Sequence, residues 1–235
     1  MASVLLVRHG RTAANSGGVL AGRSAGVFLD DVGVAQAQET AQRLAALPVA
    51  AVVSSPLERC QQTAEAIRDA AKKPVDVQTD DRLTECGYGD WTGQELKKLA
   101  KDPMWKVVQG HPSGATFPGG ESLRQMQSRA VEAVRDWSAR IGAAHGDTAM
   151  WVAVSHGDVI KALLADALGM HLDNFQRIVV DPASVSVISY TPLRPFVVRY
   201  NEHGDLSGLA PRGRPRRSTR RKPASSDADV GGGAG

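Results

Sequence analysis

The stretch that decides the fold is SVLLVRHGRT, residues 3–12. Four of the five residues in Ser3–Val7 are apolar and two of them are β-branched, which predicts a short buried strand. This strand ends by delivering Arg8, His9 and Gly10 to one point. A neutral imidazole can attack phosphorus, an adjacent guanidinium can hold phosphate oxygens, and glycine lets the backbone approach closely. The stretch therefore predicts both a first strand and a phosphoryl-transfer site with His9 as nucleophile.

Strands and helices alternate along the rest of the chain. Short apolar runs predict buried strands at Val49–Ser54, Val75–Gln78 and Ala149–Ser155. Longer segments predict helices between Asp31 and Pro48 and over Leu57–Ala71, Ser122–Arg140 and Val159–Leu168. This alternation predicts an α/β fold with a mainly parallel sheet and helices on both faces. Two last strands, Val185–Ser189 and Phe196–Tyr200, are expected to form an antiparallel hairpin near one edge.

Local signals add detail to the expected helices. The helix over Ser122–Arg140 carries one apolar stripe: Leu123, Met126, Ala130, Val134 and Trp137. The spacing in the first helix falls on Ala35, Gln38, Gln42 and Ala45, with Leu44 and Leu47 as apolar anchors. Asp30-Asp31 can cap the free amides of its first turn. Ser55 and Pro56 suit the cap and the first position of the second helix, and Asp158 suits the cap of the late helix.

Composition bounds the class of protein. The chain has 235 residues, of which 42% are hydrophobic, enough for one core and a spare segment. Its two cysteines, Cys60 and Cys86, argue against a disulfide scaffold or a structural zinc site. We find no apolar run of the roughly 20 residues that would span a bilayer, and no signal peptide. The expected location is therefore the cytoplasm, without membrane attachment.

The net charge of +3 comes from the end of the chain. Seven of the residues in 212–222 are arginine or lysine and none is acidic. We expect a catalytic domain over residues 1–205 and a basic, glycine-rich, disordered tail over residues 206–235. The basic run could make weak, salt-dependent contact with nucleic acid or another acidic surface, although it contains no aromatic residue for base stacking.

Two further strand ends carry the same residue types as the first, an arginine and a histidine. The second strand ends at Ser54-Ser55-Pro56, with Arg59 one turn into the next helix, and the late strand ends at His156-Gly157. In an open parallel sheet, ligands bind beyond the carboxyl ends of the strands, so these groups are expected to meet Arg8 and His9 there. Arg8 and Arg59 would hold a phosphate as forked donors, and His156 would donate a hydrogen bond to the phosphoryl oxygens.

The remaining site residues come from loops. Asn15 follows the first strand and offers an amide donor, and Gly22 and Gly157 are candidate close backbone approaches. Glu85 is the candidate proton donor, because a nearby bound phosphate favours a protonated carboxyl group. Asp90 is the competing carboxylate. Tyr88 is close enough in sequence to Glu85 to touch a ligand, and residues 82–120 are expected to form a lid of loops and short helices.

Four motifs in order resemble the histidine phosphatase superfamily, the phosphoglycerate mutase-like enzymes. They are LVRHGRT with Asn15 behind it, SSPLERCQQTA at 54–64, LTE with GDWTG at 83–93, and VSHG at 154–157. The resemblance covers about residues 3–200 and implies a three-layer α/β/α sandwich. It also implies that His9 becomes phosphohistidine, that Arg8, Arg59 and His156 form the phosphate pocket, and that Glu85 is the proton donor. Asn15, Gly22 and Gly157 match ligand-contact positions, and neither a metal nor another cofactor is expected.

Departures from the family pattern bear on the reaction. Many members have Glu where Arg11 stands, so this chain is expected to carry an extra positive charge at the mouth of the site. Mutases commonly have a hydroxyl residue where Ala21 stands, and residues 93–120 are short for a mutase. We therefore favour a phosphomonoester hydrolase acting on a small phosphorylated metabolite over a phosphomutase that uses the same histidine. For a mutase, four basic residues of the lid and the following helix could bind a second acidic group, or they could simply form a solvated helix face: Lys97, Lys98, Lys101 and Arg124. Substrate identity and oligomeric state stay open.

Overall fold

A computed structural model describes residues 2–210 of the chain. They form a six-stranded sheet in the order β3-β2-β4-β1-β5-β6. The strands are β1 (Ser3–Arg8), β2 (Val49–Ser54), β3 (Val77–Thr79), β4 (Met150–Ser155), β5 (Val185–Tyr190) and β6 (Pro195–Glu202). The first four strands are mutually parallel, whereas β5 runs antiparallel to β1 and β6 antiparallel to β5. The predicted mainly parallel sheet with an antiparallel hairpin at one edge is confirmed.

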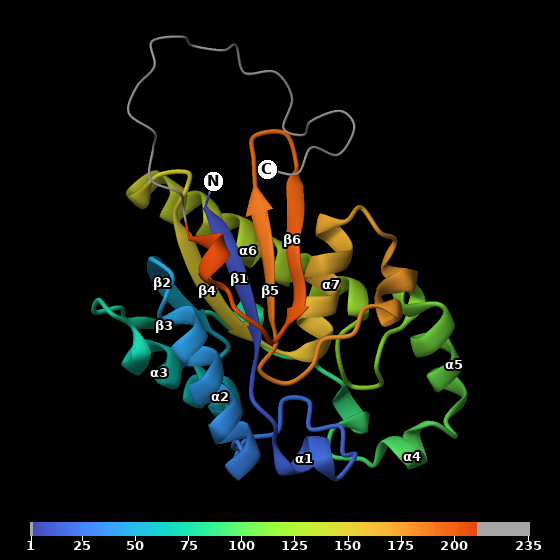
Figure 1. The fold of residues 1–235 in the computed structure, drawn as a ribbon. Coiled ribbons are helices and arrows are strands. Elements are labelled where there is room, and N and C mark those ends of the chain that lie inside the picture. Colours follow the sequence, from blue (N-terminus) through green and yellow to red (C-terminus); the bar gives the residue numbers. More distant parts are fainter. Residues whose placement is uncertain (1, 211–235) are drawn as a thin grey trace, which may run out of the picture.

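Helices cover both faces of this sheet and one of its ends. The helices are α1 (Ala13–Ser16), α2 (Asp31–Leu44), α3 (Glu58–Ala70), α4 (Leu96–Leu99), α5 (Pro103–Gly110), α6 (Leu123–His145) and α7 (Gly157–Ala167). Helices α2 and α3 pack on one face, and α6 and α7 on the other. Helices α1, α4 and α5 gather beyond the end at which β1 finishes (Figure 1). The molecule is therefore the expected three-layer sandwich, with extra helices at the carboxyl ends of the strands.

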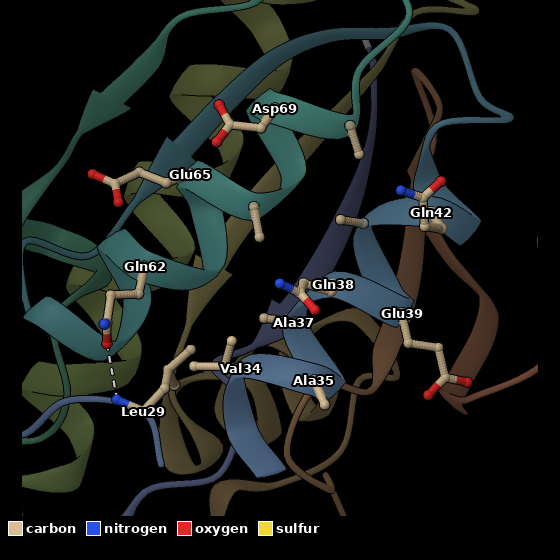
Figure 2. Close-up of a pocket in the computed structure, with 13 residues that line it drawn as sticks. Leu29, Val34, Ala35, Ala37, Gln38, Glu39, Gln42, Gln62, Glu65 and Asp69 are labelled. Atoms are coloured by element: carbon tan, nitrogen blue, oxygen red, sulfur yellow. Dashed lines mark hydrogen bonds between the residues drawn. The ribbon is translucent and has the colours of Figure 1, made fainter. Parts of the chain in front are cut away.

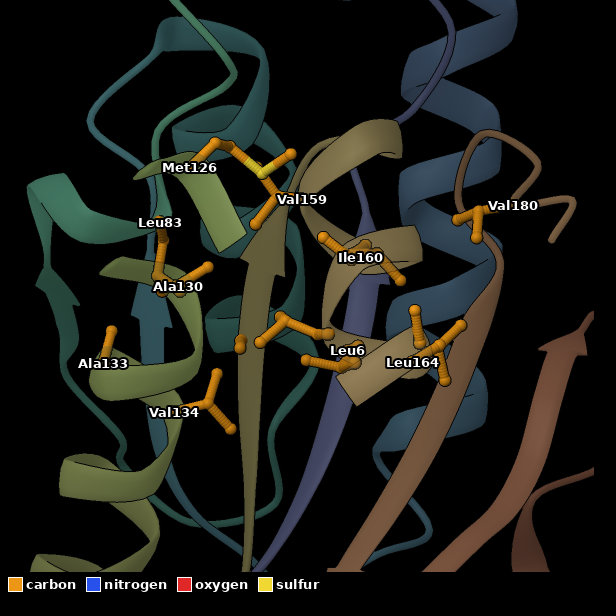
Figure 3. Close-up of a cluster of buried hydrophobic side chains, with 14 of the residues drawn as sticks. Leu6, Leu83, Met126, Ala130, Ala133, Val134, Val159, Ile160, Leu164 and Val180 are labelled. Atoms are coloured by element: carbon orange, nitrogen blue, oxygen red, sulfur yellow. The ribbon is translucent and has the colours of Figure 1, made fainter. Parts of the chain in front are cut away.

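The larger part of the core lies under α6 and α7. Figure 3 shows side chains of both helices meeting Leu6 of β1. The predicted apolar stripe of α6 is entirely buried: Leu123, Met126, Ala130, Val134 and Trp137. This helix starts where the sequence predicts, because the Ser122 hydroxyl accepts a hydrogen bond from the Gln125 amide in a capping box.

Helix α2 presents a different face to the sheet from the one we expected. The Asp30 side chain caps the helix at the Gly33 amide, as predicted. The expected anchors Leu44 and Leu47 are buried, but the other buried residues of the helix are Gly33, Ala37, Thr40 and Ala41 rather than the expected stripe. Of the predicted stripe, Ala35, Gln38 and Gln42 instead line a surface groove between α2 and α3 (Figure 2). Small residues face the sheet because the start of α2 lies directly against the chain that leaves β1.

Two glycines permit that close approach. A Cβ atom added to Gly33 would lie 1.9 Å from the backbone oxygen of Arg11, and one added to Gly10 would lie 2.4 Å from the backbone oxygen of Gly33. Both clashes are with backbone, which cannot swing away as a long side chain can. The contact therefore fixes α2 beside the loop that carries His9.

Substituting Gly33→Ala is expected to destabilise the protein by about 1–3 kcal/mol, because the backbone must shift to relieve the clash. Chemical denaturation followed by circular dichroism measures this change. Gly110→Ala is the matched control, since a Cβ there meets nothing within 4 Å. It should change the free energy of unfolding by less than about 1 kcal/mol. Equal midpoints for the two variants would contradict the packing described.

The described body continues past residue 205. Leu206 is 1% exposed and packs in the core under α2 and α3, and a 3₁₀ turn follows over Ser207–Leu209. The basic run 212–222 and the rest of the expected disordered tail lie outside the described residues. Within residues 2–210, no helix has both the length and the apolar character needed to cross a membrane.

Candidate active site

A cavity of about 610 Å³ opens beyond the carboxyl ends of the parallel strands. Strands β1, β2 and β4 end beside it, and the lid segment between residues 82 and 120 forms part of its wall. All but one of the residues predicted for the site line this cavity: Arg8, His9, Asn15, Gly22, Arg59, Glu85, Tyr88 and Gly157. The exception is His156, which is fully buried behind Arg59.

The His9 imidazole is oriented with one nitrogen unprotonated and facing a cation. Its Nδ1 lies 2.7 Å from the carbonyl oxygen of Gly10, and because a carbonyl can only accept, Nδ1 carries the proton. Its Nε2 lies 3.3 Å from Nε of Arg59, which can only donate. Burial lowers the pKa of His9 well below its usual value, and the positive charges of Arg59 and Arg8 lower it further. His9 is therefore held neutral, with a lone pair on Nε2.

Two guanidinium groups flank His9 and keep unused donors. Arg59 donates from Nη2 to the carbonyl oxygen of Gly22 at 2.7 Å, and Arg8 donates from Nη1 to the carbonyl oxygen of Val180 at 2.6 Å. Nη1 of Arg59 and Nε of Arg8 are buried and have no hydrogen-bond partner among the described residues. Buried donors without partners are rare, so this pair indicates a place for an absent acceptor.

His156 lies next to His9, with 5.3 Å between the ring centroids. Its Nδ1 contacts Nη2 of Arg59 at 3.2 Å, so in this arrangement Nδ1 accepts and Nε2 donates to Oγ of Ser55 at 2.8 Å. Burial, followed by the charge of Arg59, lowers the pKa of His156 well below its usual value. The neutral ring therefore supports Arg59 from behind.

Ser55 was expected to cap the second helix, and this prediction is wrong. Helix α3 begins at Glu58 after Leu57, and no side chain caps it. Oγ of Ser55 instead accepts a hydrogen bond from His156 at 2.8 Å and a longer one, at 3.4 Å, from the Leu57 amide just before the helix. The contact with His156 comes from the neighbouring strand, so spacing along the chain does not indicate it.

Glu85 combines burial with a raised proton affinity. Its side chain lies in the cavity wall, and Oε1 accepts a hydrogen bond from the Cys86 amide at 2.8 Å. Burial raises the pKa of this carboxyl group to about 7, with the negative charge of Asp158 adding to the effect. Such a group can donate a proton near neutral pH and accept one back. The competing Asp90 is exposed and does not line the cavity.

A network that sequence reasoning missed holds the backbone of Glu85. The carbonyl oxygen of Glu85 accepts hydrogen bonds from Nε of Arg23 at 2.8 Å and from Nη2 of Arg129 at 3.1 Å. The same two guanidinium groups bind Oε1 of Glu121, at 2.7 Å for Arg23 and 2.6 Å for Arg129. Arg129 lies in α6, eight residues after Glu121, whereas Arg23 lies 98 residues before Glu121, so no local spacing links all three residues. Arg129 also donates to the carbonyl oxygen of Thr84.

Gly22 and Gly157 line the cavity for different reasons. Gly22 has φ +53, and an added Cβ would lie 2.9 Å from Oγ1 of Thr92, so this position needs glycine. Its carbonyl oxygen orients Arg59. A Cβ on Gly157 would meet Nε of Arg8 at an ordinary 3.5 Å. Asn15 lines the cavity while its Oδ1 accepts from the Thr12 amide at 3.1 Å.

Tyr88 belongs to a second group of polar residues across the cavity. Its hydroxyl donates to Oδ2 of Asp158 at 2.8 Å, and Oδ1 of Asp158 lies 3.3 Å from Nζ of Lys161. The prediction that Asp158 caps the late helix is wrong, since the residue before α7 is His156 and no side chain caps it. We missed Lys161, although its position three residues after Asp158 places both on one helix face.

Basic residues expected near the mouth of the site lie elsewhere. Arg11 pairs with Asp30 at 2.9 Å and does not line the cavity. The four side chains considered for a second acidic group are also absent from its wall: Lys97, Lys98, Lys101 and Arg124. All four are exposed. Among residues 2–210, no group of three or more His, Cys, Asp or Glu side chains is arranged to hold a metal ion.

Comparison with known proteins gives the family. The family model of the histidine phosphatase superfamily (branch 1) matches residues 4–203. The chain belongs to the histidine phosphatase superfamily.

Relatives within this family differ in their named activities. A probable phosphoglycerate mutase GpmB of Proteus mirabilis is 32% identical over 193 residues, covering 81% of this chain and 86% of the relative. A glucosyl-3-phosphoglycerate phosphatase of Mycolicibacterium vanbaalenii is 34% identical over 180 residues, covering 73% of this chain and 76% of the relative. The structure of a mycobacterial glucosyl-3-phosphoglycerate phosphatase with VO3 superposes with a TM-score of 0.75 at 26% identity, covering 86% of this chain and 99% of that one.

Proposed function

We propose that this protein is a metal-independent phosphomonoester hydrolase that acts through a phosphohistidine on His9. One observation carries the proposal: the unprotonated Nε2 of His9, which accepts a hydrogen bond from Nε of Arg59, shares one cavity with two guanidinium groups that each keep a buried, unpartnered donor. A phosphate dianion supplies the acceptor that these donors lack and the charge that the two arginines neutralise. Membership of the histidine phosphatase superfamily supports the same reaction.

The reaction divides into two steps. In the first, Nε2 of His9 attacks phosphorus, the bond from phosphorus to the leaving oxygen breaks, and the protonated Glu85 carboxyl group donates its proton to that oxygen. In the second, the Glu85 carboxylate takes a proton from a water molecule, which attacks phosphorus and releases His9 and phosphate. Arg8 and Arg59 stabilise the charge on the phosphoryl oxygens throughout, and His156 holds Arg59 in place.

The second candidate is a phosphomutase that uses the same histidine and returns the phosphoryl group to another hydroxyl. The observation in its favour is the 32% identity with relatives named probable phosphoglycerate mutase. Against it, the four basic residues considered for a second acidic group lie outside the cavity wall. The hydrolase also has a relative at 34% identity that is named a phosphatase.

We further propose that the substrate is a small phosphorylated metabolite, because the cavity of about 610 Å³ is of a size for one small ligand.

A cytoplasmic location is supported by the two cysteines, Cys60 and Cys86, which are both free and buried. Contact of the basic run 212–222 with nucleic acid or another acidic surface stays a proposal from charge alone.

Trapping the intermediate tests the hydrolase. The full chain is mixed with an aryl phosphate in the presence of a chelator, quenched in alkali within the first turnovers, digested and analysed by mass spectrometry. We expect one phosphoryl group, acid-labile and alkali-stable, on the peptide that contains His9. Full turnover without any labelled His9, or turnover abolished by the chelator and restored by a metal ion, would overturn the proposal.

A further inference from the structure

Lys161, the one lysine in the described cavity wall, is already engaged by its neighbours. Nζ of Lys161 lies 3.3 Å from Oδ1 of Asp158, 3.3 Å from Oε1 of Gln176, and 5.8 Å from the centroid of the Phe175 ring. An ammonium group has three N–H donors, and these three neighbours match them. Asp158 is held in turn by the Tyr88 hydroxyl. The positive charge of Lys161 is therefore neutralised within the cavity wall before any ligand arrives.

The described cavity wall offers no other free cation. Its arginine and lysine side chains are Arg8, Arg59 and Lys161, and the first two serve the phosphate. Besides Glu85, two carboxylates, Asp158 and Asp181, also lie in the wall. A second anionic group on a substrate would meet these carboxylates with no unpaired cation to balance its charge, which costs binding energy in a partly enclosed site.

The rest of the wall suits uncharged groups. Apolar contact comes from the Trp105 side chain, which stacks on Trp91, and from Leu96 and Val108. Amide side chains of Asn15 and Gln109 also line the cavity. Amides donate and accept hydrogen bonds, so they match hydroxyl groups, and an indole face matches the C–H face of a sugar or polyol.

We infer that the Asp158–Lys161 ion pair is a specificity device that restricts this enzyme to phosphomonoesters of neutral, hydroxyl-bearing alcohols such as polyols and sugars. The inference rests on the proposed phosphatase function. Its consequence is discrimination against substrates that carry a carboxylate or second phosphate near the phosphoryl group. This excludes the bisphosphorylated intermediate that a mutase needs.

The test compares two substrates of one carbon skeleton, racemic glycerol 3-phosphate and racemic 3-phosphoglycerate, which differ by a hydroxymethyl group in place of a carboxylate. In the wild type we expect kcat/KM to favour glycerol 3-phosphate by about tenfold or more. Asp158→Asn keeps an acceptor for Tyr88 but frees the Lys161 charge, so this ratio should fall by about tenfold. Lys161→Gln leaves Asp158 unbalanced, so the ratio should rise.

The ratio of the two kcat/KM values reports specificity alone, because any effect of Asp158 on the proton affinity of Glu85 acts on both substrates alike. The double variant Asp158→Asn with Lys161→Gln should return the ratio to within about threefold of the wild type if charge alone decides it. A wild type that prefers 3-phosphoglycerate, or single variants that leave the ratio unchanged, would overturn the inference. Hydrolysis of p-nitrophenyl phosphate in the same preparations reports the proposed function separately, so the two proposals can fail independently.

Discussion

Replacing His9 with alanine removes the attacking nitrogen, and we expect kcat/KM for p-nitrophenyl phosphate to fall by about 10⁴-fold or more. The reason is that neither arginine can replace the nucleophile, since both are protonated and one of them already contacts Nε2 of His9. The loss should appear in kcat, because Arg8 and Arg59 still bind the phosphoryl group. Steady-state kinetics with a chelator present measure it.

His145→Ala is the matched control, since this histidine is exposed at the end of α6 and does not line the cavity. Its activity should stay within about twofold of the wild type, because surface substitutions away from a site have small effects. Circular dichroism should show both variants folded. Substantial turnover by folded His9→Ala protein would place the nucleophile elsewhere.

Replacing Glu85 with glutamine should separate the two chemical steps. Glutamine cannot donate a proton to the leaving oxygen, so hydrolysis of an alkyl phosphate should slow by about 10²–10⁴-fold. A nitrophenolate ion leaves without a proton, so the first step should continue with p-nitrophenyl phosphate. The second step then lacks its base, and phosphohistidine should accumulate as a burst of nitrophenolate followed by slow turnover. Stopped-flow absorbance measures this burst, and its absence in a folded variant with slow turnover would contradict the role of Glu85.

The same group sets the pH profile of the wild type. Because burial raises the pKa of Glu85 to about 7, the proton-donating form is present below that pH and is lost above it. For an alkyl phosphate, kcat/KM should therefore fall by about tenfold for each pH unit above 7. The Glu85→Gln variant has no proton to lose there, so its low activity should not show this decline. A decline of equal slope in the variant would assign the titration to another group.

The position of the site could be predicted from the sequence because it follows from topology. Parallel strands present their carboxyl ends at one edge of a sheet, so the residues after β1, β2 and β4 had to converge. Arg8, His9 and Arg59 accordingly line one cavity. Capping of α2 by Asp30 and the buried stripe of α6 could be predicted for a different reason, since both follow from residue spacing within one helix.

The partners of individual polar groups could not be predicted, because they depend on contacts between distant segments. Ser55 contacts His156, 101 positions away, and Asp158 accepts a hydrogen bond from Tyr88, 70 positions away, whereas the sequence predicted a helix cap for both Ser55 and Asp158. Arg11 was placed at the mouth of the site, whereas it pairs with Asp30. The face of α2 was also missed, since it is set by the contact between Gly33 and the backbone of Arg11.

The network around the Glu85 carbonyl keeps the residues that hold the proton donor separate from the lid residues that line the cavity. Arg23 and Arg129 hold that carbonyl from outside residues 93–114, where α4 and α5 contribute Leu96 and Val108 to the cavity wall. The backbone of the proton donor is thus held by residues that do not line the cavity. Substitutions in α4 and α5 can therefore reshape the cavity wall at Leu96 and Val108 while the hydrogen bonds that hold Glu85 stay in place.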